Sequence, residues 1–166
     1  MELLNFEPLV APLADALRAR GWRMATAESC TGGLIAAACT ALAGSSDWFE
    51  RGFVTYTNEA KSQLLGVDAA LFDRVGAVSE EVARAMVHGA LQRAPVQLAV
   101  AVTGIAGPGG AVPGKPVGTV WLAWGTAGGV QTERLQLAGD RDAVRGASVS
   151  AALQRLLQRM QQEVRP

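Results

Sequence analysis

The sequence predicts an α/β protein, a three-layer α/β/α sandwich around a mixed, mostly parallel five-stranded sheet. Two hydrophobic periodicities alternate along the 166 residues, one typical of amphipathic helices and the other of strands. Residues 97–102 (QLAVAV) form an unbroken apolar run, which is typical of a buried central strand. Two further strands are joined by a glycine-rich hairpin, Gly125 to Gly129, and we expect this hairpin to make one edge strand antiparallel.

Turn residues and capping residues divide the chain into alternating elements. Strands are expected at residues 22–28, 52–57, 97–102, 118–124 and 130–138. Helices are expected at residues 7–20 and 31–42, and a short helix turn from Asp68 through Arg74. Three further helices are expected after capping residues: one from Asn58 to about Gly66, one that starts at Ser79, and one after Asp140. The last helix has an apolar side made of Val149, Leu153, Leu156 and Met160.

The composition favours one soluble globular domain that spans residues 1–166. The 15 basic and 15 acidic residues balance, so no charge excess points to a nucleic-acid partner. The apolar stretches are too short to cross a bilayer, and the first residues, MELLNFEP, lack the basic region of a signal peptide. Two cysteines make no disulfide framework. We therefore expect a cytoplasmic protein.

Four unusual loops each follow a predicted strand. They are residues 28–33 (ESCTGG), 56–61 (YTNEAK), 103–110 (TGIAGPGG) and 139–145 (GDRDAVR). Ligands of such sheets bind beyond the carboxyl ends of the strands. We therefore expect these loops to form one site.

Ser29 lies at the first strand-to-helix junction. Gly32 and Gly33 allow another group to approach the backbone closely, and the following helix start offers N–H groups to an oxyanion or a phosphate. The alternative is that Ser29 or Thr31 only caps the helix, which is what these residue types usually do.

Lys61 is one of only two lysines beside thirteen arginines. Lysine can lose its proton in a protein, whereas arginine cannot. Counted from Asn58, Lys61 is the third helical residue, where the helix dipole disfavours a cation and would lower the lysine pKa, as a general base requires. The alternative is a lysine that reaches solvent or pairs with Glu59 or another carboxylate.

Tyr56, the only tyrosine, precedes Lys61 by five residues. Its hydroxyl could relay a proton or hold the lysine in place. The alternative is an ordinary strand aromatic whose hydroxyl lies at the surface.

Two further loops carry candidate substrate contacts. Thr103 ends the central strand and is followed by Gly104, Gly107, Gly109 and Gly110, and such loops can bind anions through backbone N–H groups. Arg141 and Arg145 lie one turn apart on one helix face and could grip a phosphate or a carboxylate, or else pair with Asp140 and Asp142.

Several familiar sites are absent from the sequence. The only histidine, His88, is predicted on the polar side of its helix, so it is a poor activator for Ser29 or Cys30. No cluster of histidine and cysteine has metal-ligand spacing, so no metal or cofactor is expected. The sequence from Gly109 to Lys115 is similar to a phosphate-binding P-loop, but Pro116 stands where that motif requires Ser or Thr. The motif is therefore excluded, and Lys115 has no defined role.

The combined motifs resemble the CinA C-terminal domain family, from about residue 8 to about residue 160. They are TAESCTGG (26–33), GSSDWFERGFVTYTNEAK (44–61), GAVSEEV (76–82), TGIAGPGG (103–110), KPVGTVW (115–121) and GDRDAVR (139–145). Stand-alone members of that family are nicotinamide-nucleotide amidohydrolases. The separate N-terminal domain of longer members is absent here, so the chain resembles the single-domain form.

The resemblance implies hydrolysis of nicotinamide mononucleotide (NMN) to nicotinate mononucleotide and ammonia, a step of pyridine nucleotide salvage. It implies that Ser29 is the nucleophile, with Tyr56 and Lys61 beside it. It also implies a homo-oligomer and substrate contacts near the reacting group and the phosphate. The candidate substrate-binding residues are Thr31, Gly32, Gly33, Asn58, Thr103, Gly104, Arg141 and Arg145.

Two other functions stay open at this point. One is a nucleotide-binding regulatory module without chemistry, linked to competence or DNA-damage responses, which would have no need of the Ser29, Tyr56 and Lys61 set. The other is a phosphohydrolase, which would normally want a carboxylate-held metal that the sequence does not suggest.

Overall fold

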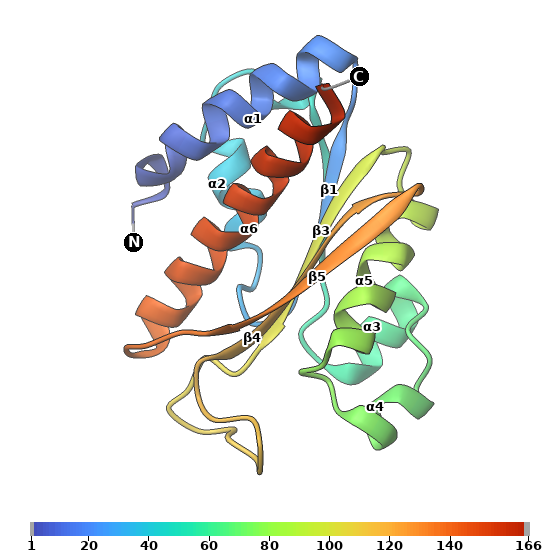
Figure 1. Cartoon of the computed structure of the whole chain (residues 1–166), viewed down its shortest axis with the longest axis vertical. Helices are drawn as coiled ribbons and strands as arrows, with labels where there is room; N and C mark the ends of the chain where they lie inside the picture. The colour runs from blue at the N-terminus through green and yellow to red at the C-terminus, as the bar shows by residue number, and fades with distance from the viewer. Residues whose placement is uncertain (1, 165–166) are drawn as a thin grey trace.

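A computed structural model describes residues 2–164, and within them a five-stranded sheet has helices on both faces (Figure 1). The strands are β1 (Met24–Glu28), β2 (Phe49–Val54), β3 (Leu98–Gly104), β4 (Thr119–Thr126) and β5 (Gly129–Gln136). The helices are α1 (Glu7–Arg20), α2 (Leu34–Thr40), α3 (Asn58–Leu65), α4 (Ala70–Val75), α5 (Glu80–Arg93) and α6 (Arg141–Val164), with short 3₁₀ turns at Leu3–Phe6 and Ser45–Asp47.

The helices form two layers, which confirms the predicted α/β/α sandwich. Helices α1, α2 and α6 cover one face of the sheet, and α3, α4 and α5 cover the other (Figure 1). Alternate residues of β3 serve the two layers: Val100 packs with the α1/α6 side, whereas Ala99 and Ala101 pack with the α5 side. The central strand is buried along residues 98–103, as its apolar run predicts.

The strand order is β2-β1-β3-β4-β5, and one expectation about it is wrong. β1 pairs in parallel with β2 and β3, and β4 is antiparallel to both β3 and β5. The antiparallel strand is therefore inside the sheet, and the edge strand β5 runs in the direction of β1. The reason is that β4 pairs directly with the central strand β3, so the chain reverses once between β3 and β4 and again in the hairpin between β4 and β5. As a consequence, the carboxyl ends of β1, β2, β3 and β5 meet at one edge.

Two caps confirm the sequence analysis and one corrects it. The Ser79 hydroxyl accepts the Val82 N–H at the start of α5, and the Asp140 carboxylate accepts the Ala143 N–H at the start of α6. At α3, however, the cap is Thr57, whose hydroxyl accepts the Ala60 N–H at 3.0 Å. The expectation of a cap at Asn58 is wrong, because the chain is extended at Thr57 and Asn58 is already the first helical residue.

Close packing seats α3, which carries Lys61, against α5. A Cβ added at Gly89 of α5 would collide with the main-chain carbonyl of Leu65 in α3. Glycine at this position therefore allows the two helices to approach closely. The contact between α3 and α5 therefore helps to set the position of Lys61 relative to the edge of the sheet.

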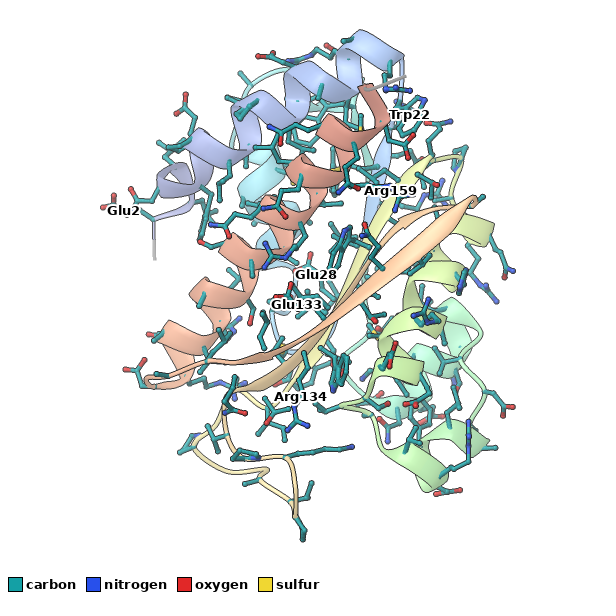
Figure 2. The ribbon with its side chains drawn as sticks, viewed as in Figure 1. Glu2, Trp22, Glu28, Glu133, Arg134 and Arg159 are labelled. Carbon is teal, nitrogen blue, oxygen red and sulfur yellow. The ribbon has the colours of Figure 1, made fainter. Side chains whose placement is uncertain are left out.

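Helix α6 binds the other face through its predicted apolar side. Val149, Leu153, Leu156 and Met160 are all fully buried. Glu133 of β5 forms an ion pair with Arg155, and Arg159 donates to the hydroxyl of Thr126 in β4, so polar contacts also join β4 and β5 to α6. Figure 2 labels Glu133 and Arg159. In the part of the chain that the structure describes, no helix has the length and apolar character needed to span a membrane.

Candidate active site

A pocket of about 250 Å³ opens at the edge where the four strand ends meet. All four predicted loops contribute to its lining, together with Ala77 and Val78, which precede α5. Of the predicted site residues, the pocket contains Ser29, Tyr56, Asn58, Lys61, Thr103, Gly104 and Arg141. The structure therefore brings together residues that are up to 112 positions apart, from 29 to 141.

Ser29 and Lys61 make direct contact in this pocket. Lys61 Nζ lies 3.0 Å from Ser29 Oγ, to which it donates a hydrogen bond. The side chains come from different elements, since Ser29 follows β1 and Lys61 is the fourth residue of α3. Both are buried, with exposed fractions of 7% for Ser29 and 1% for Lys61. The geometry is within the reach that a nucleophile and its base require.

Burial lowers the pKa of Lys61 below its ordinary value, because the charged ammonium loses its hydration; the neighbouring Cys30 has a smaller effect in the opposite direction. None of the ion pairs found in residues 2–164 includes Lys61. The two alternatives for this lysine, solvent exposure and pairing with Glu59, are therefore both wrong. The helix dipole contributes less than the sequence suggests, since Lys61 stands one position further from the helix start.

Tyr56 has separate partners for its backbone and its hydroxyl. Its carbonyl oxygen accepts from Lys61 Nζ at 3.2 Å and, at a longer 3.4 Å, from Ser29 Oγ. Its side chain is 56% exposed, and its hydroxyl accepts from Arg141 Nη2 at 2.8 Å. The main chain of Tyr56 thus orients the serine–lysine pair, whereas its hydroxyl lies at the pocket mouth.

Arg141, the first residue of α6, also donates to the Gly107 carbonyl at 2.9 Å. Together with its bond to Tyr56, this contact joins three of the four loops across the pocket. Arg141 is exposed and lines the pocket, so its guanidinium is available to an anionic group of a ligand.

Thr103 and Gly104 form the pocket floor at the end of β3. The Thr103 hydroxyl is buried and donates to the Ala77 carbonyl at 2.9 Å, which ties β3 to the segment before α5. A Cβ at Gly104 would approach the Val120 side chain to 2.7 Å, so glycine there is required by the packing of β3 on β4.

Thr31, Gly32 and Gly33 are outside the residues that line the pocket. The two glycines have left-handed backbones, with φ of 58° and 99°, and they delay the start of α2 until Leu34. The amides of Ile35 and Ala36 at that helix start already donate to the carboxylate of Glu28. The predicted anion site at this helix is therefore occupied by the protein itself.

Sequence reasoning missed Glu28, although a signal was present. A glutamate at the end of a strand that is otherwise apolar or small is unusual, because a buried carboxylate needs several donors. Thr26, two residues earlier, and Thr31, three residues later, are two of those donors.

Arg145 is also away from the pocket, which corrects the expectation of an arginine pair. It donates to the main-chain carbonyls of Cys30 at 3.2 Å and Thr31 at 3.3 Å. Four residues along a helix advance by about 6 Å, so Arg141 and Arg145 reach different loops although they share a helix face. Lys115 lies elsewhere as well, with Nζ donating to the Val75 carbonyl at 2.6 Å.

Cys30 lines the pocket beside Ser29, but burial raises the pKa of its thiol to about 12. The thiol is then protonated at neutral pH, and a protonated thiol is a poor nucleophile. His88 is exposed on α5, as predicted, and residues 2–164 contain no group of three or more histidine, cysteine, aspartate or glutamate side chains suited to a metal ion.

The state of Cys30 leads to a prediction. Cys30→Ala should keep catalytic turnover within about threefold of the parent, because the thiol supplies neither nucleophile nor base. Iodoacetamide at neutral pH should likewise leave the native protein active. A loss of turnover beyond about a hundredfold in the alanine variant would instead make Cys30 the attacking group.

Fold and pocket together define an α/β/α protein with a buried serine–lysine pair at the carboxyl edge of its sheet. The family model described as the CinA C-terminal domain matches residues 6–160, and the chain belongs to this family.

Named relatives and solved structures agree with this assignment. The chain is 55% identical over 150 residues to the nicotinamide-nucleotide amidohydrolase PncC of Pseudomonas putida. The aligned residues cover 90% of this chain and 94% of the relative. The chain is 53% identical over 151 residues to the protein of the same name from Escherichia coli strain K12, covering 90% and 92%. The crystal structure of the competence/damage inducible protein CihA from Agrobacterium tumefaciens superimposes with a TM-score of 0.90 at 46% identity, covering 93% and 94% of the two chains.

Proposed function

We propose that the chain is an amidohydrolase that converts NMN to nicotinate mononucleotide and ammonia. The observation that carries the proposal is the 3.0 Å contact between Ser29 Oγ and Lys61 Nζ inside the pocket. The names of relatives that are more than 50% identical over nine-tenths of this chain support the choice of substrate.

The first half of the reaction forms an ester on Ser29. Neutral Lys61 takes the hydroxyl proton across the contact it already makes, and Ser29 Oγ attacks the carboxamide carbon of NMN. The carbonyl oxygen becomes an oxyanion, for which backbone N–H groups near Gly104 on the pocket floor are candidate donors. Lys61 then returns its proton to the amide nitrogen, the C–N bond breaks and ammonia leaves.

The second half releases the acid. A water molecule gives a proton to Lys61 and attacks the ester carbon, and the proton then returns to Ser29 Oγ as the ester bond breaks. Tyr56 assists through its carbonyl, which holds Lys61 and Ser29, and its hydroxyl and Arg141 form the polar mouth of the pocket. We assign the substrate phosphate to Arg141 and the adjoining glycine loop, with Asn58 and Thr103 as further contacts.

The pH dependence follows from the lowered pKa of Lys61. Only the neutral amine can act as base, so kcat/KM should rise with pH as Lys61 loses its proton, with a midpoint below the ordinary lysine value of 10.5. Initial rates of ammonia release across the pH range check this. A rate that falls as pH rises through that range would contradict the assignment of Lys61 as base.

The direct test of function is ammonia release from NMN by purified, metal-free protein. We expect steady turnover and the appearance of nicotinate mononucleotide in equal amount. A regulatory binding module would instead bind NMN and release no ammonia over hours, and that outcome would reject the enzymatic proposal.

The same proposal places the protein in pyridine nucleotide salvage in the cytoplasm. We infer that residues 1–166 form a single domain. We also infer that the protein works as a homo-oligomer, either a dimer or a larger assembly. Analytical ultracentrifugation of the purified chain checks the assembly state.

A further inference from the structure

Glu28, labelled in Figure 2, is the last residue of β1. It is fully buried, and its carboxylate accepts four hydrogen bonds. Oε1 accepts from the Thr31 hydroxyl at 2.7 Å and the Ile35 N–H at 2.9 Å. Oε2 accepts from the Thr26 hydroxyl at 3.1 Å and the Ala36 N–H at 3.0 Å. One side chain therefore joins the end of β1 to the first residues of α2.

Burying a carboxylate at the start of a short helix costs free energy, because the carboxylate loses its hydration. Among the described ion pairs none includes Glu28, so hydrogen bonds alone stabilise a buried charge. Gly33, the residue before this seven-residue helix, has a left-handed backbone and no side chain, so it offers no cap of its own, and Glu28 accepts from the first amides instead. What the glutamate adds is a bridge across residues 29–33, the segment that contains Ser29.

Arg145 holds the same segment from α6. Glu28 accepts from the donors that follow Ser29, and Arg145 donates to the carbonyls of Cys30 and Thr31. The main chain of Ser29 is itself bound on both sides, since its N–H donates to the Val102 carbonyl and its carbonyl accepts from Gly32, each at 3.0 Å. The serine is thus fixed relative to β3 and α2, while Lys61 approaches it from α3.

We propose that Glu28 is a positioning residue that holds Ser29 Oγ in line with Lys61 Nζ. Glu28 is absent from the pocket lining and fully buried, so a substrate does not touch it. Its loss should therefore reduce kcat and leave KM nearly unchanged. The inference rests on the proposed function for its turnover readout, but Ser29 reactivity can be measured without that function.

The test variant is Glu28→Gln. The carboxamide keeps the size of the side chain, but its NH₂ group cannot accept, so in either orientation it faces one of the Ile35 and Ala36 amides. We expect the rate at which a fluorophosphonate probe labels Ser29 to fall by about tenfold or more, because small displacements of a reacting group have large effects on rate. Ammonia release from NMN should show the same loss in kcat, with KM within about threefold.

Glu133→Gln is the matched control. It makes the same chemical change in an ion pair with Arg155, between β5 and α6 and away from the pocket. We expect its labelling rate to stay within about twofold of the parent. Circular dichroism of each variant defines the folded fraction to which the rates are normalised.

If Glu28→Gln does not fold, Thr31→Val decides the question, because it removes only the shortest of the four bonds and keeps the side-chain shape. We expect this variant to lower the labelling rate of Ser29 by a smaller factor than Glu28→Gln.

The proposal would be overturned if a folded Glu28→Gln kept its labelling rate and kcat within twofold of the parent. If Glu28→Gln does not fold, the same result in Thr31→Val would overturn it. Parent protein that is labelled at Ser29 but releases no ammonia would reject the proposed function alone, and the labelling comparison would still test Glu28.

Discussion

Lys61→Arg should reduce ammonia release from NMN by about a thousandfold or more, because it removes the base that activates Ser29. Arginine keeps the positive charge and the long side chain, but its guanidinium cannot accept a proton at any pH the protein survives. The loss should appear in kcat, measured by coupled ammonia detection at saturating NMN. Turnover within tenfold of the parent would show that Lys61 contributes charge or packing and not proton transfer.

Lys115→Arg is the matched control for this change. Lys115 is the other lysine of the chain, and its Nζ binds the Val75 carbonyl outside the pocket lining. Because arginine can donate to the same carbonyl, we expect kcat within about twofold of the parent. A comparable loss in both variants would point to a general effect of the substitution and not to catalysis by Lys61.

The burial of Lys61 also predicts a gain in stability when the charge is removed. Its folded-state pKa is lowered, so the unfolded chain binds more protons, and the free energy of unfolding rises with pH between the folded and the unfolded pKa of this group. Lys61→Met should therefore stabilise the folded protein at neutral pH, by on the order of 1 kcal/mol, while it abolishes turnover. Urea titration at pH 7 measures this, and a clearly less stable variant would contradict the account of a desolvated amine that has hydrogen-bond partners but no ion pair among the described residues.

Ser29→Ala is the second substitution with a large expected effect. It removes the nucleophile but leaves the pocket shape and the main-chain bonds of residue 29, so turnover should fall by about a thousandfold or more while NMN still binds. Ammonia release and isothermal titration with NMN check the two parts. Ser148→Ala is the control, since this buried serine donates only within α6, to the Val144 carbonyl, and should retain normal turnover.

Residual activity in Ser29→Ala distinguishes two mechanisms. If Lys61 activated a water molecule directly, the alanine variant would keep a substantial part of the parent rate, because the base would remain. Activity above about a tenth of the parent would therefore favour direct hydrolysis over an ester on Ser29.

The sequence was sufficient to predict the layer order and the loops of the pocket. Periodicity placed the strands, and the rule that ligands bind at the carboxyl ends of strands then grouped Ser29, Tyr56, Lys61 and Thr103. The direction of β4 was harder, because a hairpin at the end of a chain can attach to the sheet by either of its strands. Which strand pairs with β3 depends on long-range packing and not on the turn.

The role of individual polar side chains was predictable only where few partners compete. The rarity of lysine in this chain points to Lys61, but the polar segment YTNEAK does not indicate that its side chain is buried. Glycines after Ser29 suggested an open anion site, whereas Glu28 fills it. Arg145 looked like a ligand contact because helix periodicity gives the face of a residue but not what lies opposite it.

The central claim, that Ser29 carries the acyl group and Lys61 activates it, can be tested most directly by mass spectrometry of acid-quenched protein turning over NMN. The account predicts an added nicotinate-mononucleotide acyl group on Ser29 of the parent protein, and none in Ser29→Ala. An acyl group on Cys30, or ammonia release at the parent rate by Ser29→Ala, would contradict it.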